Sequence, residues 1–194
     1  LYHGTQTQVG GQTITNNIDL ATEGGMVWFK ARDAASSATI TDTDMGAGNY
    51  LETSNNAAKN YGNTYMTSFN TDGFTLGAFS GFTNSDLDYA SWTFRKAPKF
   101  FDVVNYEGNG VAGRTISHNL GSVPGMIIIK GLDSNYEWSV YHRGVDSTAP
   151  EDYYLWLNHN SARGDNAGYW NDTAPTSTEF TLGNNGNVNS AVGG

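Results

Sequence analysis

Short apolar runs separated by polar turns form the basic pattern of this chain. The runs Met26–Lys30 and Met126–Lys130 combine apolar, β-branched and aromatic residues, as buried strands do. Stretches rich in Asn, Asp and Gly lie between the runs and are typical of turns. The one helix candidate, residues 57–60, is too short and too rich in Asn, so the pattern predicts an all-β protein. The other expected strands are Tyr89–Phe94, Phe100–Tyr106 and Tyr153–Leu157.

Three sequence blocks occur twice in the same order, which indicates an internal duplication. Their second copies follow 100, 102 and 106 residues after the first, so small insertions are expected in the loops. The matched blocks are Gly25–Lys30 with Gly125–Lys130, Thr13–Thr15 with Thr115–Ser117, and Phe74–Gly77 with Phe180–Gly183.

The duplication predicts two tandem homologous β-sandwich units, jelly-roll-like in form, at residues 1–97 and 98–194. Pro98 marks the joint, because proline ends regular strand pairing. When the halves are aligned, Tyr89–Phe94 closes the first unit but has no counterpart before Gly194, so we expect the second unit to lack its last strand. The first unit likewise begins partway through its first strand, since Tyr2 aligns with Tyr106. A bare sheet edge near Phe180–Gly183 would then favour self-association or contact with another protein.

Charge and composition narrow the range of partners. The chain carries 10 Lys and Arg against 19 Asp and Glu, a net charge of −9, which disfavours nucleic acid and anionic membranes. No apolar run approaches the roughly 20 residues that cross a bilayer, so membrane insertion is not expected. The absence of cysteine excludes disulfides and thiolate metal sites.

Catalytic motifs are weak throughout. The glycine pattern at residues 108–113 precedes an expected strand rather than the helix that binds a nucleotide phosphate. Ser139, His142 and Asp146 are close in sequence but lack a nucleophile elbow, and the four histidines lack zinc-motif spacing. Acidic residues that occur in neighbouring pairs lie in expected loops. Residues 42–46 form one such loop, where calcium binding remains an alternative. We therefore expect no catalytic residue, cofactor or resident metal, and no enzymatic activity.

Aromatic residues of the second half are the candidate ligand-binding group. Their ring faces could stack on sugars beside Asn and Asp side chains, although large aromatics usually serve core and interface packing. The candidate glycan-binding residues are Trp138, Tyr154, Trp156 and Trp170.

The block Thr115–Lys130 resembles the signature of a repeated domain in tail-fibre and other virion structural proteins of marine bacteriophages. The segments Trp92–Val104, Tyr141–Gly144, Trp170–Thr178 and Phe180–Gly183 fit the same family. The resemblance implies a non-catalytic structural or adhesive module at the particle surface, in a tail fibre, appendage or decoration. Its implied partners are copies of itself, other virion proteins and a host-surface glycan, and the family supplies no catalytic residues.

Two other classes of function remain open on the sequence. A carbohydrate-binding, lectin-like module, free or within a depolymerase, would use the aromatic residues. A hydrolase would use loop carboxylates such as Asp86 with Asp88, or Glu151 with Asp152.

Overall fold

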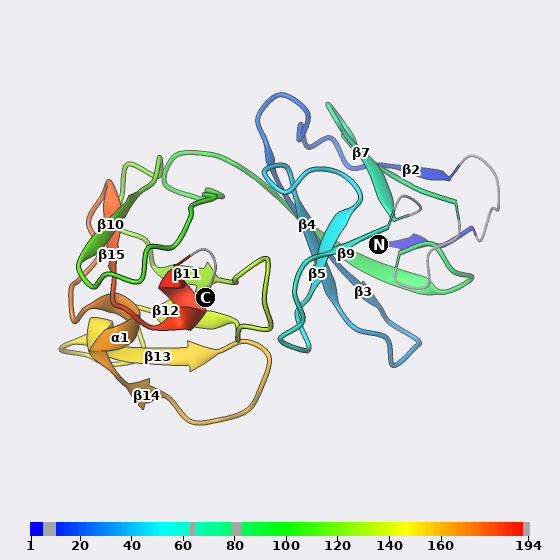
Figure 1. Cartoon of the computed structure of the whole chain (residues 1–194). Coiled ribbons are helices and arrows are strands. Elements are labelled where there is room, and N and C mark those ends of the chain that lie inside the picture. Colours follow the sequence, from blue (N-terminus) through cyan, green and yellow to red (C-terminus); the bar gives the residue numbers. More distant parts are fainter. Residues whose placement is uncertain (6–10, 63–64, 79–82, 192–194) are drawn as a thin grey trace. The chain divides into compact units, whose positions relative to one another are not determined.

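The computed structural model describes residues 1–5, 11–62, 65–78 and 83–191 of the chain (Figure 1). Antiparallel strands make up most of its regular structure, which confirms the all-β prediction. The chain divides into two compact units, residues 1–53 with 59–97, and residues 54–58 with 98–194. None of the helices in the described part of the chain has the length and apolar character needed to cross a bilayer.

The first unit contains two antiparallel sheets. The larger sheet has the order β1-β9-β3-β4-β5-β6 and the smaller has the order β2-β8-β7. The larger sheet consists of β1 (Tyr2–His3), β3 (Gly25–Ala31), β4 (Thr39–Asp42), β5 (Asn49–Glu52), β6 (Asn60–Tyr61) and β9 (Asp88–Arg95). The smaller sheet consists of β2 (Gln12–Thr15), β7 (Met66–Asn70) and β8 (Gly73–Leu76).

The core of the first unit lies between these sheets. Burial alternates strictly along β3, where Val27 and Phe29 are buried and their neighbours are half-buried, as expected of a strand with one face in a core. The Phe29 ring meets the edge of the Phe74 ring from β8, with the ring centroids 5.3 Å apart. Full burial of such a side chain contributes roughly 1.5–3 kcal/mol, so this contact helps to hold the two sheets together.

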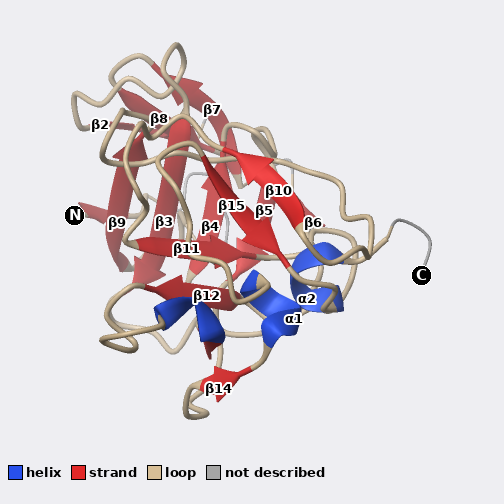
Figure 2. Cartoon of the chain, turned by 90° about the vertical axis from the view of Figure 1, so that its left-hand side faces the viewer, coloured by secondary structure: helices blue, strands red, loops and turns tan. Residues whose placement is uncertain are grey.

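The second unit has a four-stranded sheet, β11-β12-β13-β14, and a two-stranded sheet, β10-β15. Figure 2 shows its short helices in blue among the red strands. The strands are β10 (Arg114–Ser117), β11 (Met126–Ile129), β12 (Ser139–His142), β13 (Tyr153–Trp156), β14 (Gly164–Asp165) and β15 (Glu179–Leu182). The helices are a 3-10 turn at Pro150–Asp152, α1 (Ala167–Trp170) and α2 (Gly186–Asn189).

The strand registers of the two units correspond. The pairing of β3 with β4, from Met26↔Asp42 to Phe29↔Thr39, recurs between β11 and β12 with every residue number raised by 100. The pair Ile14↔Phe74 likewise corresponds to Ile116↔Phe180. The sequence blocks that recur along the chain therefore occupy equivalent ladder positions.

A buried asparagine makes equivalent bonds in each unit. Asn84 donates to the carbonyl of Gly77 at 3.0 Å and accepts from the Thr5 amide at 2.9 Å. Asn189 donates to the carbonyls of Gly183 and Val111, at 2.8 and 3.0 Å, and accepts from the Asn109 amide at 2.9 Å. Each amide side chain thus joins segments that are far apart in the sequence.

A tyrosine hydroxyl reinforces the same position in each unit. Tyr2 donates to the carbonyl of Thr83, and Tyr106 donates to the carbonyl of Val188. Both hydroxyls contact the residue just before the buried asparagine, so the polar arrangement is part of the duplicated architecture.

The boundary between the units differs in one place from the sequence-based expectation. The split after Ala97 coincides with the expected joint, but residues Ser54–Ala58 belong to the second unit. Within that unit the Trp138 indole donates to the carbonyl of Asn55, and the Asn56 amide donates to Glu137. These are contacts between segments distant in sequence, which strand patterning does not reveal.

The expected strand Phe100–Tyr106 does not form. Only isolated bridging occurs there, at Phe101, and the Asp102 carboxylate accepts from the Val103 and Asn119 amides in place of a strand partner. In the first unit the counterpart of Tyr106, Tyr2, lies in β1 and pairs with β9. The described residues of the second unit contain no strand at the position of β9, so Tyr106 has no such partner.

The edge that a counterpart of β9 would cover belongs to β11. Within the described residues β15, which contains Phe180, pairs with β10 alone, whereas its counterpart β8 lies between β2 and β7. Phe180 pairs with Ile116, and the Gly183 amide donates to the carbonyl of Tyr169. The last residues of the chain, 192–194, lie outside the described residues.

Candidate functional site

Two of the four candidate glycan-binding residues are buried. Trp138 is 4% exposed and Trp170 is 2% exposed. Their indole nitrogens donate to the carbonyls of Asn55 and Tyr153 at 3.1 Å each, so the polar edge of each ring is satisfied inside the protein. Burial removes the ring faces on which a sugar would stack, and both tryptophans serve packing.

Tyr154 is half-buried and enclosed by its neighbours. Its ring stacks on that of Tyr169, with centroids 3.8 Å apart and planes 16° from parallel. Gly164 of β14 lies opposite Tyr154 in the ladder, and a Cβ placed there would be 2.4 Å from the ring. The glycine thus lets the β14 backbone approach the ring closely, which leaves little of Tyr154 for a ligand.

Trp156 is the remaining candidate. It is half-buried, its ring meets Tyr154 and Tyr169 edge-on at 5.0 and 5.7 Å, and the exposed His159 ring is tilted against it at 5.0 Å. Trp156 therefore differs from Trp138 and Trp170, which are buried, and from Tyr154, which is stacked face to face. The structure brings Tyr154, Trp156 and Trp170 together around Tyr169, with Trp170 itself buried, while Trp138 is buried outside this cluster.

The residues of the candidate triad are not arranged for nucleophilic catalysis. Ser139 and His142 are three positions apart on β12, so their side chains leave opposite faces of the strand. The Ser139 hydroxyl is buried without a hydrogen-bond partner in the described part of the chain. Backbone amides of Thr148 and Ala149, and the Arg163 guanidinium, hold the pKa of Asp146 below its usual range.

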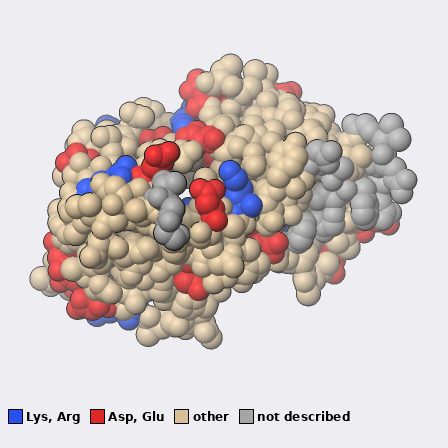
Figure 3. Space-filling view, in the orientation of Figure 1, with Lys and Arg blue, Asp and Glu red and all other residues tan. Residues whose placement is uncertain are grey.

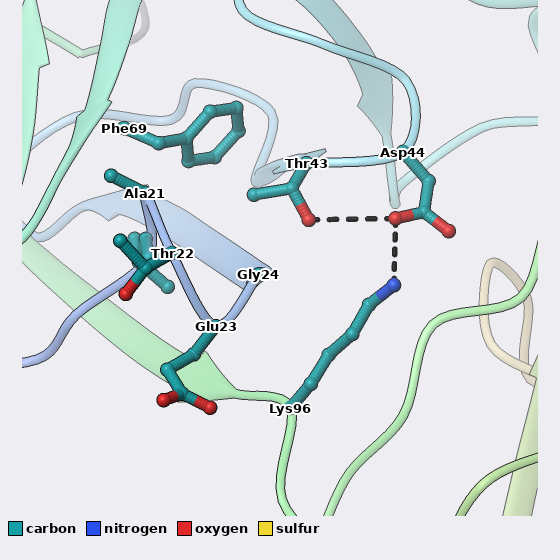
Figure 4. A pocket seen from close by; sticks show the side chains of 9 residues that line it. Ala21, Thr22, Glu23, Gly24, Thr43, Asp44, Phe69 and Lys96 are labelled. Carbon is teal, nitrogen blue, oxygen red and sulfur yellow. Dashed lines mark hydrogen bonds and ion pairs between the residues drawn. The ribbon is translucent and has the colours of Figure 1, made fainter.

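Asp42 and Asp44, the first candidate carboxylate pair, are engaged in a turn and an ion pair. Asp42 accepts from the amides of Asp44 and Met45, and burial raises its pKa. Asp44 forms an ion pair with Lys96 at 2.7 Å, in a shallow hollow that is also lined by Thr43 and Phe69 (Figure 4). Among the residues with described positions, no three His, Asp or Glu side chains gather as a metal site.

Asp86 and Asp88, the second candidate carboxylate pair, both bind the side chain of His3. The Asp88 carboxylate lies 3.0 Å from His3 Nδ1, and the Asp86 carboxylate lies 2.9 Å from His3 Nε2. The bonds to Asp88 and Asp86 raise the pKa of His3. Because His3 pairs with Asp88 in the ladder, this contact fastens β1 to β9.

Lys130 lies partly buried at the end of β11. Its amine donates to the carbonyls of Gly131 and Ser134, as that of Lys30 does to Ala31 and Ala34 in the first unit. Burial lowers the pKa of Lys130 to about 8, against an opposing effect of Glu137. The lysine binds local backbone in both units, so the perturbed pKa reflects a structural position.

Several polar contacts were not predicted from the sequence. They are those of the buried asparagines Asn84 and Asn189 and the contact of His3 with two aspartates. The asparagines could have been identified from the sequence, because an Asn recurs after each of the matched blocks Phe74–Gly77 and Phe180–Gly183.

Comparisons with known proteins give a family but no described activity. No curated protein and no solved structure matches the chain. A family model described as a domain of unknown function, DUF7483, matches residues 1–193. The chain therefore belongs to the DUF7483 family.

Proposed function

We propose that this chain is a non-catalytic structural or adhesive module of a bacteriophage particle, in a tail fibre, appendage or surface decoration. The observation that carries the proposal is that buried polar side chains bind the protein's own backbone. The buried asparagines of both units bind backbone groups and hold distant segments together. The resemblance of Thr115–Lys130 to virion structural domains supplies the link to a virus particle.

The arrangement of reactive groups supports the non-catalytic part of the proposal. Ser139 is buried, His142 leaves the other face of β12, and Asp146 is bound to Arg163. General acid–base and nucleophilic catalysis need such groups within hydrogen-bond reach of one another. Most of the face drawn in Figure 3 is uncharged, with acidic side chains spread over it.

Labelling of purified phage particles tests the proposal directly. Antibodies raised against the 194-residue chain, visualised by gold labelling in the electron microscope, should decorate one surface structure of the particle. Disrupted particles probed by immunoblot provide the control for epitopes hidden in the intact particle. Presence of the protein in infected cells but not in purified particles would contradict the proposal.

An activity screen tests the non-catalytic assignment. The purified chain should leave a panel of polysaccharides and esters intact. Turnover that is abolished by Asp86→Asn or Glu151→Gln, with the fold retained by circular dichroism, would establish a hydrolase instead.

Glycan binding is a second candidate, favoured by the position of Trp156. An aromatic ring offers an apolar face on which a sugar ring can stack, and Trp156 lies beside the exposed His159 at the margin of the second core. A glycan array would show binding that is lost in Trp156→Ala and retained in Trp92→Ala, a matched change of a tryptophan that is 50% exposed in the first unit. No binding, or equal loss in both variants, would remove this candidate.

A further inference from the structure

The equivalent strands β3 and β11 differ in how their edges are covered. β3 is paired on both sides, with β4 and with β9, and its register with β9 runs from Gly25↔Arg95 to Ala31↔Tyr89. β11 pairs with β12, and within the described ranges no strand pairs with its other edge. Figure 2 shows β9, β3 and β4 side by side in one unit, and β11 at the end of its own sheet in the other.

Burial along β11 reflects the uncovered edge. Met126 is 53% exposed and Ile128 is 37% exposed, whereas their counterparts Met26 and Trp28 are half-buried next to β9. The face toward the core is also less covered, since Ile127 is half-buried where Val27 is fully buried. Apolar side chains thus line an edge that the first unit closes with a strand.

The backbone of β11 is oriented for a further strand. The Arg143 amide donates to the carbonyl of Gly125, so Gly125 and alternate residues after it bond to β12. The N–H and C=O groups of Met126 and Ile128 therefore point to the uncovered edge. The first unit shows the same alternation. The Thr43 amide donates to the carbonyl of Gly25 on the side of β4, and the Lys96 amide donates to the carbonyl of Gly24 on the side of β9.

The edge lacks the devices that usually prevent strand addition. Exposed edges are protected by charged residues, proline or a bulge, and the four residues Met126–Ile129 include none of these. The following Lys130 turns its amine to the carbonyls of Gly131 and Ser134. β9 of the same chain cannot fill the edge, because it is held between β1 and β3.

We propose that the free edge of β11 binds an extended segment with the sequence character of β9, added as an antiparallel strand. The occupant is a strand with aromatic residues at alternate positions, like Trp92 and Phe94. In the register of the first unit, its phenylalanine lies opposite Met126 and its tryptophan opposite Ile128, as Phe94 and Trp92 lie opposite Met26 and Trp28. Main-chain hydrogen bonds supply the affinity, and alternate side chains supply the specificity. This inference does not depend on the protein being part of a virus particle.

A synthetic peptide with the sequence of residues 86–96 tests the proposal on the full chain. It should bind with 1:1 stoichiometry in calorimetry and slow the hydrogen exchange of the Met126 and Ile128 amides. A peptide of the same composition in scrambled order should leave both exchange rates unchanged.

N-methylated peptides provide the sharpest control. The pairs Met26↔Phe94 and Trp28↔Trp92 belong to the same alternate set as the Lys96–Gly24 bond, so the Trp92 amide faces β3 while the Thr93 amide faces away. N-methylation at Trp92 should weaken peptide binding at least about tenfold, the loss expected from removing one main-chain bond and crowding the edge, whereas N-methylation at Thr93 should not.

A protein variant tests the same edge from the other side. Ile128→Pro removes an N–H that faces the free edge and leaves the bonds to β12 intact, a position where a strand tolerates proline. It should abolish peptide binding without changing the far-ultraviolet circular dichroism. If this variant does not fold, the pair of methylated peptides still decides the question.

Three results would overturn the proposal. They are the absence of binding at about 1 mM peptide, equal binding of the two methylated peptides, and protection of amides other than those of β11. A dimer of the chain whose Ile128 amide is protected without peptide, dispersed by Ile128→Pro, would assign the edge to a second copy instead.

Discussion

The buried asparagines Asn84 and Asn189 show how single side chains hold this fold. Asn189 is 1% exposed and makes three bonds to backbone groups of Gly183, Val111 and Asn109. A buried backbone group that loses its partner costs roughly 1–3 kcal/mol, so one side chain protects several such groups at once. An asparagine occupies this position in both units, which indicates that its hydrogen bonds are as much a part of the fold as the apolar core.

Asn189→Ala should lower the free energy of unfolding of the second unit by about 2–4 kcal/mol, because three backbone groups lose a partner. Urea denaturation followed by the fluorescence of tryptophans checks this. Asn160→Ala, at an exposed position, is the control and should change the free energy of unfolding by less than about 0.5 kcal/mol. A loss for Asn189→Ala no larger than that of the control would show that water replaces the side chain.

His3 makes the first unit sensitive to pH. Its bonds to Asp88 and Asp86 raise its pKa in the folded state above the unfolded value of about 6.5. The folded state therefore binds the proton more tightly, so the added stability is complete below about pH 6.5 and disappears as the pH rises through the folded-state pKa.

The thermal midpoint of wild type should exceed that of His3→Gln by more at about pH 5.5 than at about pH 9. The side chain of His3 is 60% exposed, so a small difference is expected. Titration of the His3 ring by NMR gives the pKa independently. A midpoint difference that does not vary with pH would refute the role of the two carboxylates.

At the scale of elements, Gly164 shows how β14 depends on one missing side chain. The β14 backbone passes so close to Tyr154 that a Cβ at Gly164 would be 2.4 Å from the ring. Tyr154 cannot easily turn away, because its ring is stacked on Tyr169. The last strand of this sheet therefore requires glycine at this position.

Gly164→Ala should destabilise the second unit by about 1–3 kcal/mol, the usual cost of forcing extra atoms into a packed site. Gly125→Ala is the matched control, since the nearest atom to its Cβ would be Arg143 Nε at an ordinary 3.5 Å. Chemical denaturation of both variants measures the difference. Equal free energies of unfolding would mean that Tyr154 and β14 separate at little cost.

Some elements followed from the sequence and others did not. Met26–Lys30, Tyr89–Phe94 and Tyr153–Leu157 lie in strands at almost the expected bounds, because their apolar and aromatic side chains suit a half-buried ladder. The short helices α1 and α2 were missed, although Asn166 and Asn185 cap their first turns. Four-residue helices have no periodicity to detect, so only the capping residues could have indicated them.

At the scale of the whole molecule, charge governs which partners are disfavoured. The chain carries a net charge of −9, and acidic side chains are spread over the face shown in Figure 3. Binding to nucleic acid depends on basic groups that displace counterions from phosphates, and an acidic protein is repelled from them.

The purified chain should therefore fail to shift double-stranded DNA in a gel assay at about 0.15 M salt. A DNA-binding protein of similar size provides the positive control. A shift that weakens steeply with added salt would reveal a basic surface that the net charge conceals.

Periodicity, composition and repetition were enough to predict the all-β class and to find which blocks correspond in the two halves. These features are local or nearly so: alternation follows from the geometry of a strand, and repeated blocks can be matched without knowing what they contact. The candidate site was harder to predict from the sequence, because a buried tryptophan and one at the margin of a core look the same in the sequence. Trp138 and Trp156 differ only in what the rest of the second unit places around them.

Contacts between distant segments depended on the folded chain. The assignment of Ser54–Ala58 to the second unit, the three bonds of Asn189 and the free edge at β11 all arise from residues brought together over long sequence separations. A strand edge is free or covered according to its neighbours, and the residues Met126–Ile129 look as buried in sequence as Met26–Phe29. The physical reason is that burial and hydrogen-bond pairing are properties of the surroundings of a residue, whereas the sequence specifies only the residue itself.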